Sequence, residues 1–242
     1  TITGTNDAPV FGTIVPTNPV IEAPTVGNTS PSAGIEVFNN GSLRFGNGSI
    51  DSVNASTGML EQPFYYKDGA WYQLTFSTYQ LNMAIAADYN NVNAKTDVDW
   101  NLEGTVNLTP TFTNTRVDNS GFNTATGTGT IVWTGEITVG TAHLKVTNVY
   151  TLNADSQFIK ANTYIKNIGN TSTENLRFWV GTRDDFVAGS DSPAKQKGNI
   201  VDGEFTMISN SSEQAKAIKI YTGAGENATA VLFYSTNENV NT

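Results

Sequence analysis

The 242-residue chain contains no cysteine and a single histidine, His143. Without cysteine there can be no disulfide, no cysteine-based zinc site and no Cys–His nucleophile, and one histidine removes most histidine-based acid–base arrangements. We interpret His143 as a structural residue at the start of a strand. Pairs of acidic residues could in principle support a hydrolase, but no motif favours one. We therefore expect a protein that is not an enzyme and that replaces disulfides by a large core or by bound metal.

Basic residues are also few, since 13 Lys and Arg face 22 Asp and Glu and the net charge is −9. No Lys/Arg-rich block occurs, which makes nucleic acids and anionic membranes poor partners. No run of 18 apolar residues and no signal-peptide pattern is present, so we expect no membrane insertion. The chain starts in the middle of a motif, and we expect it to be a piece of a longer protein that carries its export signal elsewhere.

Charged residues make up only 14% of the chain, and Asn, Thr, Ser and Gly supply much of its polar surface. Uncharged oxygens together with scattered carboxylates suit calcium, which takes six to eight oxygen ligands, better than they suit networks of ion pairs. The composition therefore predicts calcium as the cofactor.

Short apolar runs rich in β-branched and aromatic residues alternate with Gly, Asn and Asp, which is typical of an all-β protein. We predict an antiparallel β-sandwich with long calcium-binding loops and at most short helices. Only residues 77–90 and 210–217 suggest a helical turn or two. The sequence predicts strands at 144–150, 158–165 and 176–180. We expect these three strands to form an antiparallel meander.

The last of these strands runs into the segment Gly181-Thr-Arg-Asp-Asp-Phe-Val-Ala-Gly-Ser-Asp191-Ser-Pro. Loops at the end of a sandwich commonly carry ligand sites. Carboxylates suit a hard cation, and a guanidinium suits a ligand carboxylate. We predict metal ligands at Asp184, Asp185 and Asp191, with Arg183 and Ser190 contacting the ligand. The alternative is that neighbouring acids hold Arg183.

A second acidic pair occurs at Asp97 and Asp99. On an extended strand both carboxylates lie on one face, where they repel each other unless they are solvated or bridged by a cation. We predict a metal site there, and a solvated turn is the alternative. Neither acidic cluster has the twelve-residue spacing of an EF-hand, so the calcium signal is compositional.

Several aromatic residues could form a stacking platform for sugars or one wall of a peptide groove, whereas most aromatics of a β-sandwich belong to its core. The candidates are Tyr65, Tyr66, Trp71, Tyr72, Trp100 and Trp179. Tyr65 and Tyr66 flank the polar turn Lys67-Asp-Gly69, so we expect them to be exposed and include Tyr65 among the ligand-binding residues.

Two segments resemble parts of giant bacterial surface adhesins. Thr5-Asn-Asp-Ala-Pro9 resembles the joint between tandem cadherin-like or VCBS repeats. The phrase Phe178-Trp-Val-Gly-Thr-Arg-Asp-Asp-Phe186, followed by Asp191-Ser-Pro-Ala-Lys-Gln-Lys-Gly-Asn-Ile200, resembles the peptide-binding domain of RTX (repeats-in-toxin) adhesins. The resemblance implies that residues 1–20 end a preceding repeat and its linker, with calcium at Asp7, and that residues 21–242 are the ligand-binding domain.

The resemblance also implies a function. Such domains are monomeric modules near the distal end of a calcium-stiffened protein on the cell surface. They capture the C-terminal end of proteins on target cells in a calcium-dependent pocket, and so support cell adhesion and biofilm formation. By this resemblance, Asp184, Asp185 and Asp191 would hold the calcium. Arg183, Lys195 and Lys197 are candidates to contact the peptide carboxylate only because they lie close to these residues in the sequence.

Two other functions stay open. One is a calcium-dependent carbohydrate-binding module, and the other is a structural spacer repeat. The spacer is disfavoured because residues 21–242 greatly exceed an immunoglobulin-like extender of about 100 residues.

Overall fold

The computed structural model describes residues 12–13, 23–24, 36–76, 80–87, 95–96, 111–173, 176–182, 186–209, 214–223 and 229–237. Regular structure in these ranges is entirely β, in four antiparallel four-stranded sheets, and the all-β class is confirmed. None of the described residues forms a helix long and apolar enough to span a bilayer.

The sheet with the longest strands, which we call the long sheet, is a meander with the order β11-β10-β9-β8. Its strands are β8 (Thr113–Asn123), β9 (Thr128–Val139), β10 (Ala142–Leu152) and β11 (Lys160–Asn167). Alternate residues of β9 and β10 are buried, as the pleat requires of a sheet with one face in a core. Trp133 lies opposite Asn148, and Ile131 lies opposite Tyr150.

The edge strand β8 is irregular. Its register against β9 shifts twice, between Thr113 and Arg116 and between Asp118 and Gly121, and Asn114 has a positive φ of 51°. Bulges of this kind twist an edge and interrupt its row of free backbone groups. β8 is therefore poorly suited to pairing with another chain.

The other three sheets contain shorter strands. One has the order β1-β12-β6-β7, with β1 (Gly12–Thr13), β12 (Arg177–Thr182), β6 (Leu81–Ala86) and β7 (Lys95–Thr96). The second has the order β2-β3-β4-β5, with β2 (Phe38–Asn39), β3 (Leu43–Phe45), β4 (Pro63–Lys67) and β5 (Ala70–Gln73). The third has the order β14-β13-β15-β16, with β14 (Glu204–Met207), β13 (Ala194–Val201), β15 (Ala217–Thr222) and β16 (Thr229–Tyr234).

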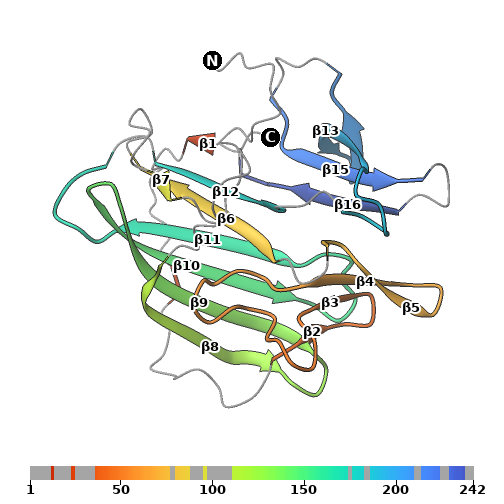
Figure 1. Cartoon of the computed structure of the whole chain (residues 1–242), viewed down its shortest axis with the longest axis horizontal. Coiled ribbons are helices and arrows are strands. Elements are labelled where there is room, and N and C mark those ends of the chain that lie inside the picture. The colour runs from red at the N-terminus through yellow and green to blue at the C-terminus, as the bar shows by residue number, and fades with distance from the viewer. Residues whose placement is uncertain are drawn as a thin grey trace.

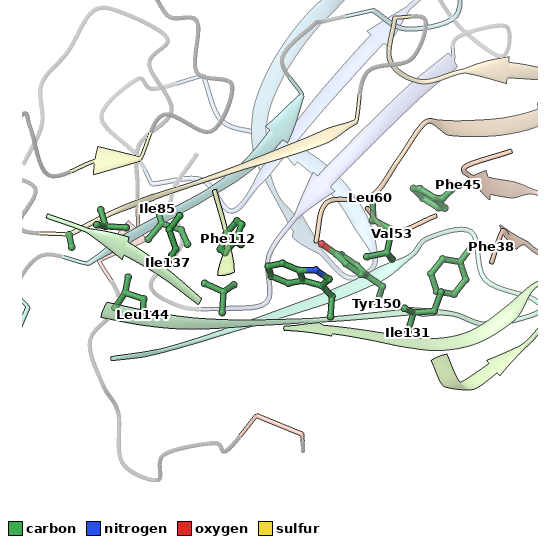
Figure 2. Packing of buried hydrophobic residues seen from close by; sticks show 14 of the residues in the cluster. Phe38, Phe45, Val53, Leu60, Ile85, Phe112, Ile131, Ile137, Leu144 and Tyr150 are labelled. Atoms are coloured by element: carbon green, nitrogen blue, oxygen red, sulfur yellow. The ribbon is translucent and has the colours of Figure 1, made fainter. Parts of the chain in front are cut away.

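The main core lies between the inner face of the long sheet and the segments that cover it, which are β2, β3, β6, β12 and the connection 46–62 (Figure 1). The covering segments contribute buried residues such as Phe38, Phe45 and Ile85. These side chains face Ile131 and Leu144 of the long sheet (Figure 2). The arrangement is sandwich-like, as predicted, although the second layer consists of two small sheets and a long connection.

Side chains of the long sheet hold the connection 46–62 through its backbone. The Trp133 indole N–H donates to the carbonyl of Ala55 at 2.9 Å, and the Tyr150 hydroxyl and the Asn148 amide donate to the carbonyl of Gly58 at 2.7 and 3.0 Å. Burial raises the pKa of Tyr150 well above its ordinary value, so the phenol stays protonated and remains a donor. These bonds satisfy backbone carbonyls of an otherwise irregular segment.

The helical tendency expected in residues 77–90 is wrong where the structure describes them. Residues 81–86 form β6, and five of its six residues are buried. A short apolar run that is covered on both faces has no alternation, so its sequence resembles that of a buried helix. Of the second segment, 210–217, residues 210–213 lie outside the described residues and Ala217 begins β15.

The predicted meander is only partly correct. β10 pairs with β11 over eight residue pairs, as expected. The third strand, β12, does not pair with β11. It pairs with β6 on one side and with β1 on the other. After β11 the chain turns at Ile168 and Gly169, whose N–H groups both donate to the carbonyl of His143, and the next strand lies in a different sheet.

Candidate functional site

The predicted ligand segment connects two sheets. It begins where β12 ends at Thr182 and finishes where β13 begins at Ala194. Arg183, Asp184 and Asp185 lie outside the described residues, so their predicted roles remain predictions. The structure describes the segment again from Phe186 onward.

The second half of the segment forms a tight turn with a buried anchor. Val187 and Ser190 exchange two backbone hydrogen bonds of 3.0 and 3.1 Å. Ala188 and Gly189 between them have positive φ values of 51° and 83°, which is the geometry of a type I′ turn. The Val187 side chain is 1% exposed. The turn is thus fixed at its base.

Polar groups follow this turn on the outer surface. Ser190 is half-buried and its hydroxyl accepts a hydrogen bond from the Ser192 N–H at 3.3 Å. Asp191 is exposed. The ring of Phe186, at the other end of the turn, packs edge-on against Phe76 with 5.6 Å between centroids. A rigid turn between an aromatic anchor and an exposed carboxylate is suited to presenting that carboxylate to a cation.

Lys195 and Lys197 lie on strand β13 rather than in a loop. They lie opposite Ile220 and Ile218 of β15, and as residues i and i+2 of one strand they share a face of the sheet. Lys195 is exposed and Lys197 is half-buried. The structure therefore places two ammonium groups on one face, within six residues of Asp191.

The remaining predicted metal ligands are not placed. Asp7, Asp97 and Asp99 lie outside the described residues. Among the residues that are described, no group of three or more His, Cys, Asp or Glu side chains could hold a metal ion. The predicted calcium site would combine Asp184 and Asp185, which lie outside the described residues, with Asp191, and it stays a prediction.

The aromatic residues of the β4–β5 hairpin divide between its two faces. Tyr65 stacks on Tyr72 with 5.4 Å between centroids and an interplanar angle of 24°. Tyr66 packs against Trp71 on the other face at 5.2 Å. Tyr66 is 48% exposed, which confirms the expectation for that residue, whereas Tyr65 is half-buried by its partner. Tyr65 lies in a different sheet from β13. Trp100 and the side chain of Trp179 are not described.

His143 lies on β10 next to Glu136 of β9. Its Nε2 is 3.4 Å from a carboxylate oxygen of Glu136, and both side chains are partly exposed. Its backbone carbonyl accepts the two N–H groups of the turn after β11. These contacts agree with a structural role for this residue.

Sequence reasoning missed one buried acid, Glu61 in the connection 46–62. Its residue surface is 8% exposed, and one of its carboxylate oxygens accepts a hydrogen bond of 2.8 Å from the Asn54 side chain. Desolvation raises the pKa of Glu61 above its ordinary value of 4.5, and the Asn54 hydrogen bond partly opposes this shift. The sequence does not mark it, because Glu61 and its neighbours in the buried run 57–63 are buried by tertiary packing.

The raised pKa of Glu61 predicts a pH-dependent stability. The pKa of Glu61 is higher in the folded protein than in the unfolded chain, so between these two pKa values the folded protein binds more protons. The free energy of unfolding therefore falls as the pH rises from about 4.5 through the folded-state pKa. Glu61→Gln keeps an acceptor for Asn54 and removes the charge. We expect the variant to gain stability relative to the wild type as the pH rises from 4 to 7, measured by urea unfolding at each pH.

The matched control is Glu204→Gln, which makes the same change at an exposed position on β14. It should follow the wild type at every pH, because exposed substitutions change stability by less than about 0.5 kcal/mol. A constant offset between Glu61→Gln and the wild type from pH 4 to 7 would contradict the shift.

Comparison of the chain with models of protein families, with curated protein sequences and with solved structures finds no match. The β-sheet architecture alone defines the class of the protein, which is all-β and sandwich-like.

Proposed function

We propose that this chain is a non-enzymatic, calcium-dependent adhesin module that binds the free C-terminal end of peptides or proteins on a target surface. Calcium held by Asp184, Asp185 and Asp191 would bind the terminal carboxylate, and Arg183 would contact it through its guanidinium. Lys195 and Lys197 would add positive charge. The module would act outside the cell, at the distal part of a surface-anchored protein, in adhesion and biofilm formation.

The observation that best supports this proposal is the position of the acidic segment between β12 and β13. The segment joins two sheets, its turn 187–190 is anchored by the buried Val187, and Asp191 emerges exposed directly after it. Two lysines follow on one face of β13. The turn 187–190 beside Asp191 is preorganised, which lowers the entropy lost on binding, and charge-assisted contacts to a carboxylate are the strong ones.

Peptide binding is tested with paired libraries of biotinylated hexapeptides that differ only in a free or an amidated C-terminus. In calcium, peptides with a free carboxylate should bind the immobilised protein, and amidation should weaken or abolish binding because it removes the charge that meets the cation. Asp185→Ala should remove binding, and Arg183→Ala should weaken it less. Biolayer interferometry provides the measurement.

Asp155→Ala is the control for these variants, because Asp155 is an exposed acid in the β10–β11 connection, outside the proposed site. It should bind like the wild type. Equal binding of amidated and free peptides would contradict the proposal. Binding of neutral glycans that is lost on chelation and in Asp185→Ala, without peptide binding, would instead support the calcium-dependent carbohydrate module.

A further inference from the structure

Strands β3, β4 and β5 carry a cationic aromatic cluster, which we define as Arg44, Phe64, Tyr66 and Trp71. Arg44 of β3 lies opposite Phe64 of β4, and Tyr66 of β4 lies opposite Trp71 of β5. Residues opposite each other, and residues two apart on a strand, share a face, so all four side chains occupy one side of this sheet. The β4–β5 hairpin extends to the edge of the molecule (Figure 1).

Two aromatic rings hold the Arg44 guanidinium. Its central carbon lies 4.4 Å from the ring centre of Phe64 and 4.7 Å from that of Trp71. Both distances are within the range of a cation–π contact. A cation–π contact involves the charge of the guanidinium and leaves its N–H donors without a hydrogen-bond acceptor.

The donors of Arg44 have no acceptor among the described residues. Its Nε is buried and makes no hydrogen bond, and no carboxylate of the described ranges pairs with the guanidinium. Desolvation lowers the pKa of Arg44, but an arginine remains charged at neutral pH. A buried donor without a partner is rare in folded proteins and needs an explanation such as an unseen water or ion. Because Nε is buried, a ligand from solvent would meet the guanidinium through its terminal nitrogens.

The surroundings of the guanidinium indicate which anion fits. Tyr66 is 48% exposed and its ring is 5.2 Å from that of Trp71, so an exposed aromatic side chain adjoins the ring that contacts the cation. A hexuronic acid matches both features, because its C–H face stacks on an aromatic ring and its carboxylate is bonded directly to the sugar ring. A carboxylate also accepts two parallel hydrogen bonds from one guanidinium.

We propose that the cationic aromatic cluster is a calcium-independent binding site for the carboxylate of an acidic sugar residue. Arg44 binds the carboxylate, and Tyr66 and Trp71 stack against the sugar ring. This site is separate from the calcium-dependent peptide site, because it lies on β3, β4 and β5 rather than between β12 and β13, and it does not depend on that proposal. The net charge of −9 opposes the approach of any anion, so we expect weak binding, with a dissociation constant of about 1 mM.

The probe is trigalacturonic acid, compared with its fully methyl-esterified form, which has the same rings without the charges. Calorimetry and the shift of the Trp71 indole N–H resonance, assigned from Trp71→Phe, measure binding to the calcium-loaded protein. We expect the acid to bind at least about tenfold more tightly than the ester, the change typical for loss of a charge-assisted contact. Adding a chelator at a temperature where the protein stays folded should leave binding unchanged.

Two variants test the role of Arg44. Arg44→Gln should reduce binding of the acid to the level of the ester, and Arg44→Lys, which keeps a cation but loses the planar fork, should bind with intermediate affinity. The lysine variant also keeps the proposal testable if the glutamine variant disturbs the hairpin. The control is Arg116→Gln on β8, which should bind as the wild type does.

Three results would overturn this proposal. The first is the absence of binding at about 10 mM acid, the second is equal binding of acid and ester, and the third is full binding by Arg44→Gln. Free-carboxylate peptides that bind in a chelator, shift Trp71 and fail to bind Arg44→Gln would assign the cluster to a peptide instead. Loss of sugar binding in Asp185→Ala but not in Arg44→Gln would place the sugar at the calcium site.

Discussion

Gly58→Ala is expected to destabilise the folded protein by about 2 to 5 kcal/mol, a large part of the stability of an ordinary domain. A methyl group at Gly58 would lie 2.3 Å from ring atoms of Trp133, which is fully buried. Gly58 also has a φ of +70°, a conformation that costs alanine strain. The two effects add at the point where the connection 46–62 is bonded to Tyr150 and Asn148.

Two other glycines separate these effects. Gly135→Ala meets the same indole, at 2.5 Å, without a positive φ, and it should cost about 1 to 3 kcal/mol through overpacking alone. Gly69→Ala, in the β4–β5 turn, has a φ of +83° and no atom within 4 Å, and it should cost only the strain of about 1 to 2 kcal/mol. Urea unfolding in calcium-containing buffer measures all three.

The order of the three variants is the test. Gly58→Ala should be the least stable, because it combines the clash with the strain. If Gly58→Ala and Gly69→Ala lost equal stability, the Trp133 ring would not rest against Gly58, and the packing of the connection 46–62 on the long sheet would be wrong.

The central strands could be predicted from sequence because local signals agree there. At the start of β10, the buried Leu144 and Val146 alternate with His143 and Lys145, so period and burial indicate the same structure. The turn between β4 and β5 was equally clear, because Asp68 and Gly69 supply the two positive φ values that it needs. The all-β class follows from such segments.

The pairing of strands across the molecule could not be predicted in this way. β12 follows β11 in the chain, yet it pairs with β6, whose residues lie 91 to 101 positions earlier. Local patterns do not encode partners so distant in sequence, because the pairing depends on which apolar faces meet in the folded core. The same limit applies to β6, whose buried run Asn82 to Ala86 has no alternation.

Of the candidate sites, only exposed and local features were accessible from sequence. Tyr66 was expected to be exposed because it borders a polar turn, and it is. The contact of Arg44 with Phe64 and Trp71 joins three strands, and no single stretch of sequence indicates it. Glu61 is buried by tertiary packing, and the same residue type is exposed at Glu204.

Removal of calcium is the second change from which we expect a large effect. The chain has no disulfide and a net charge of −9, so clustered carboxylates such as those predicted at Asp184 and Asp185 repel each other unless a cation neutralises them. A ligand that binds only the folded state stabilises it by about 2.7 kcal/mol at one hundred times its dissociation constant. For a chain of this size that corresponds to a rise in melting temperature of about 5 to 10 °C.

EDTA should therefore lower the melting temperature by at least this amount, and added calcium should restore it. Magnesium should not, because it demands a smaller octahedral site and gives up its water reluctantly. Asp185→Ala should reproduce part of the loss in calcium and respond less to EDTA, whereas the exposed Asp155→Ala should melt like the wild type. Calcium binds ionised carboxylates. The difference between the melting temperatures in calcium and in EDTA should therefore shrink as the pH falls toward 4. Identical melting curves in calcium and in EDTA, from protein in which metal analysis finds no calcium, would contradict both the calcium site and the adhesin function that depends on it.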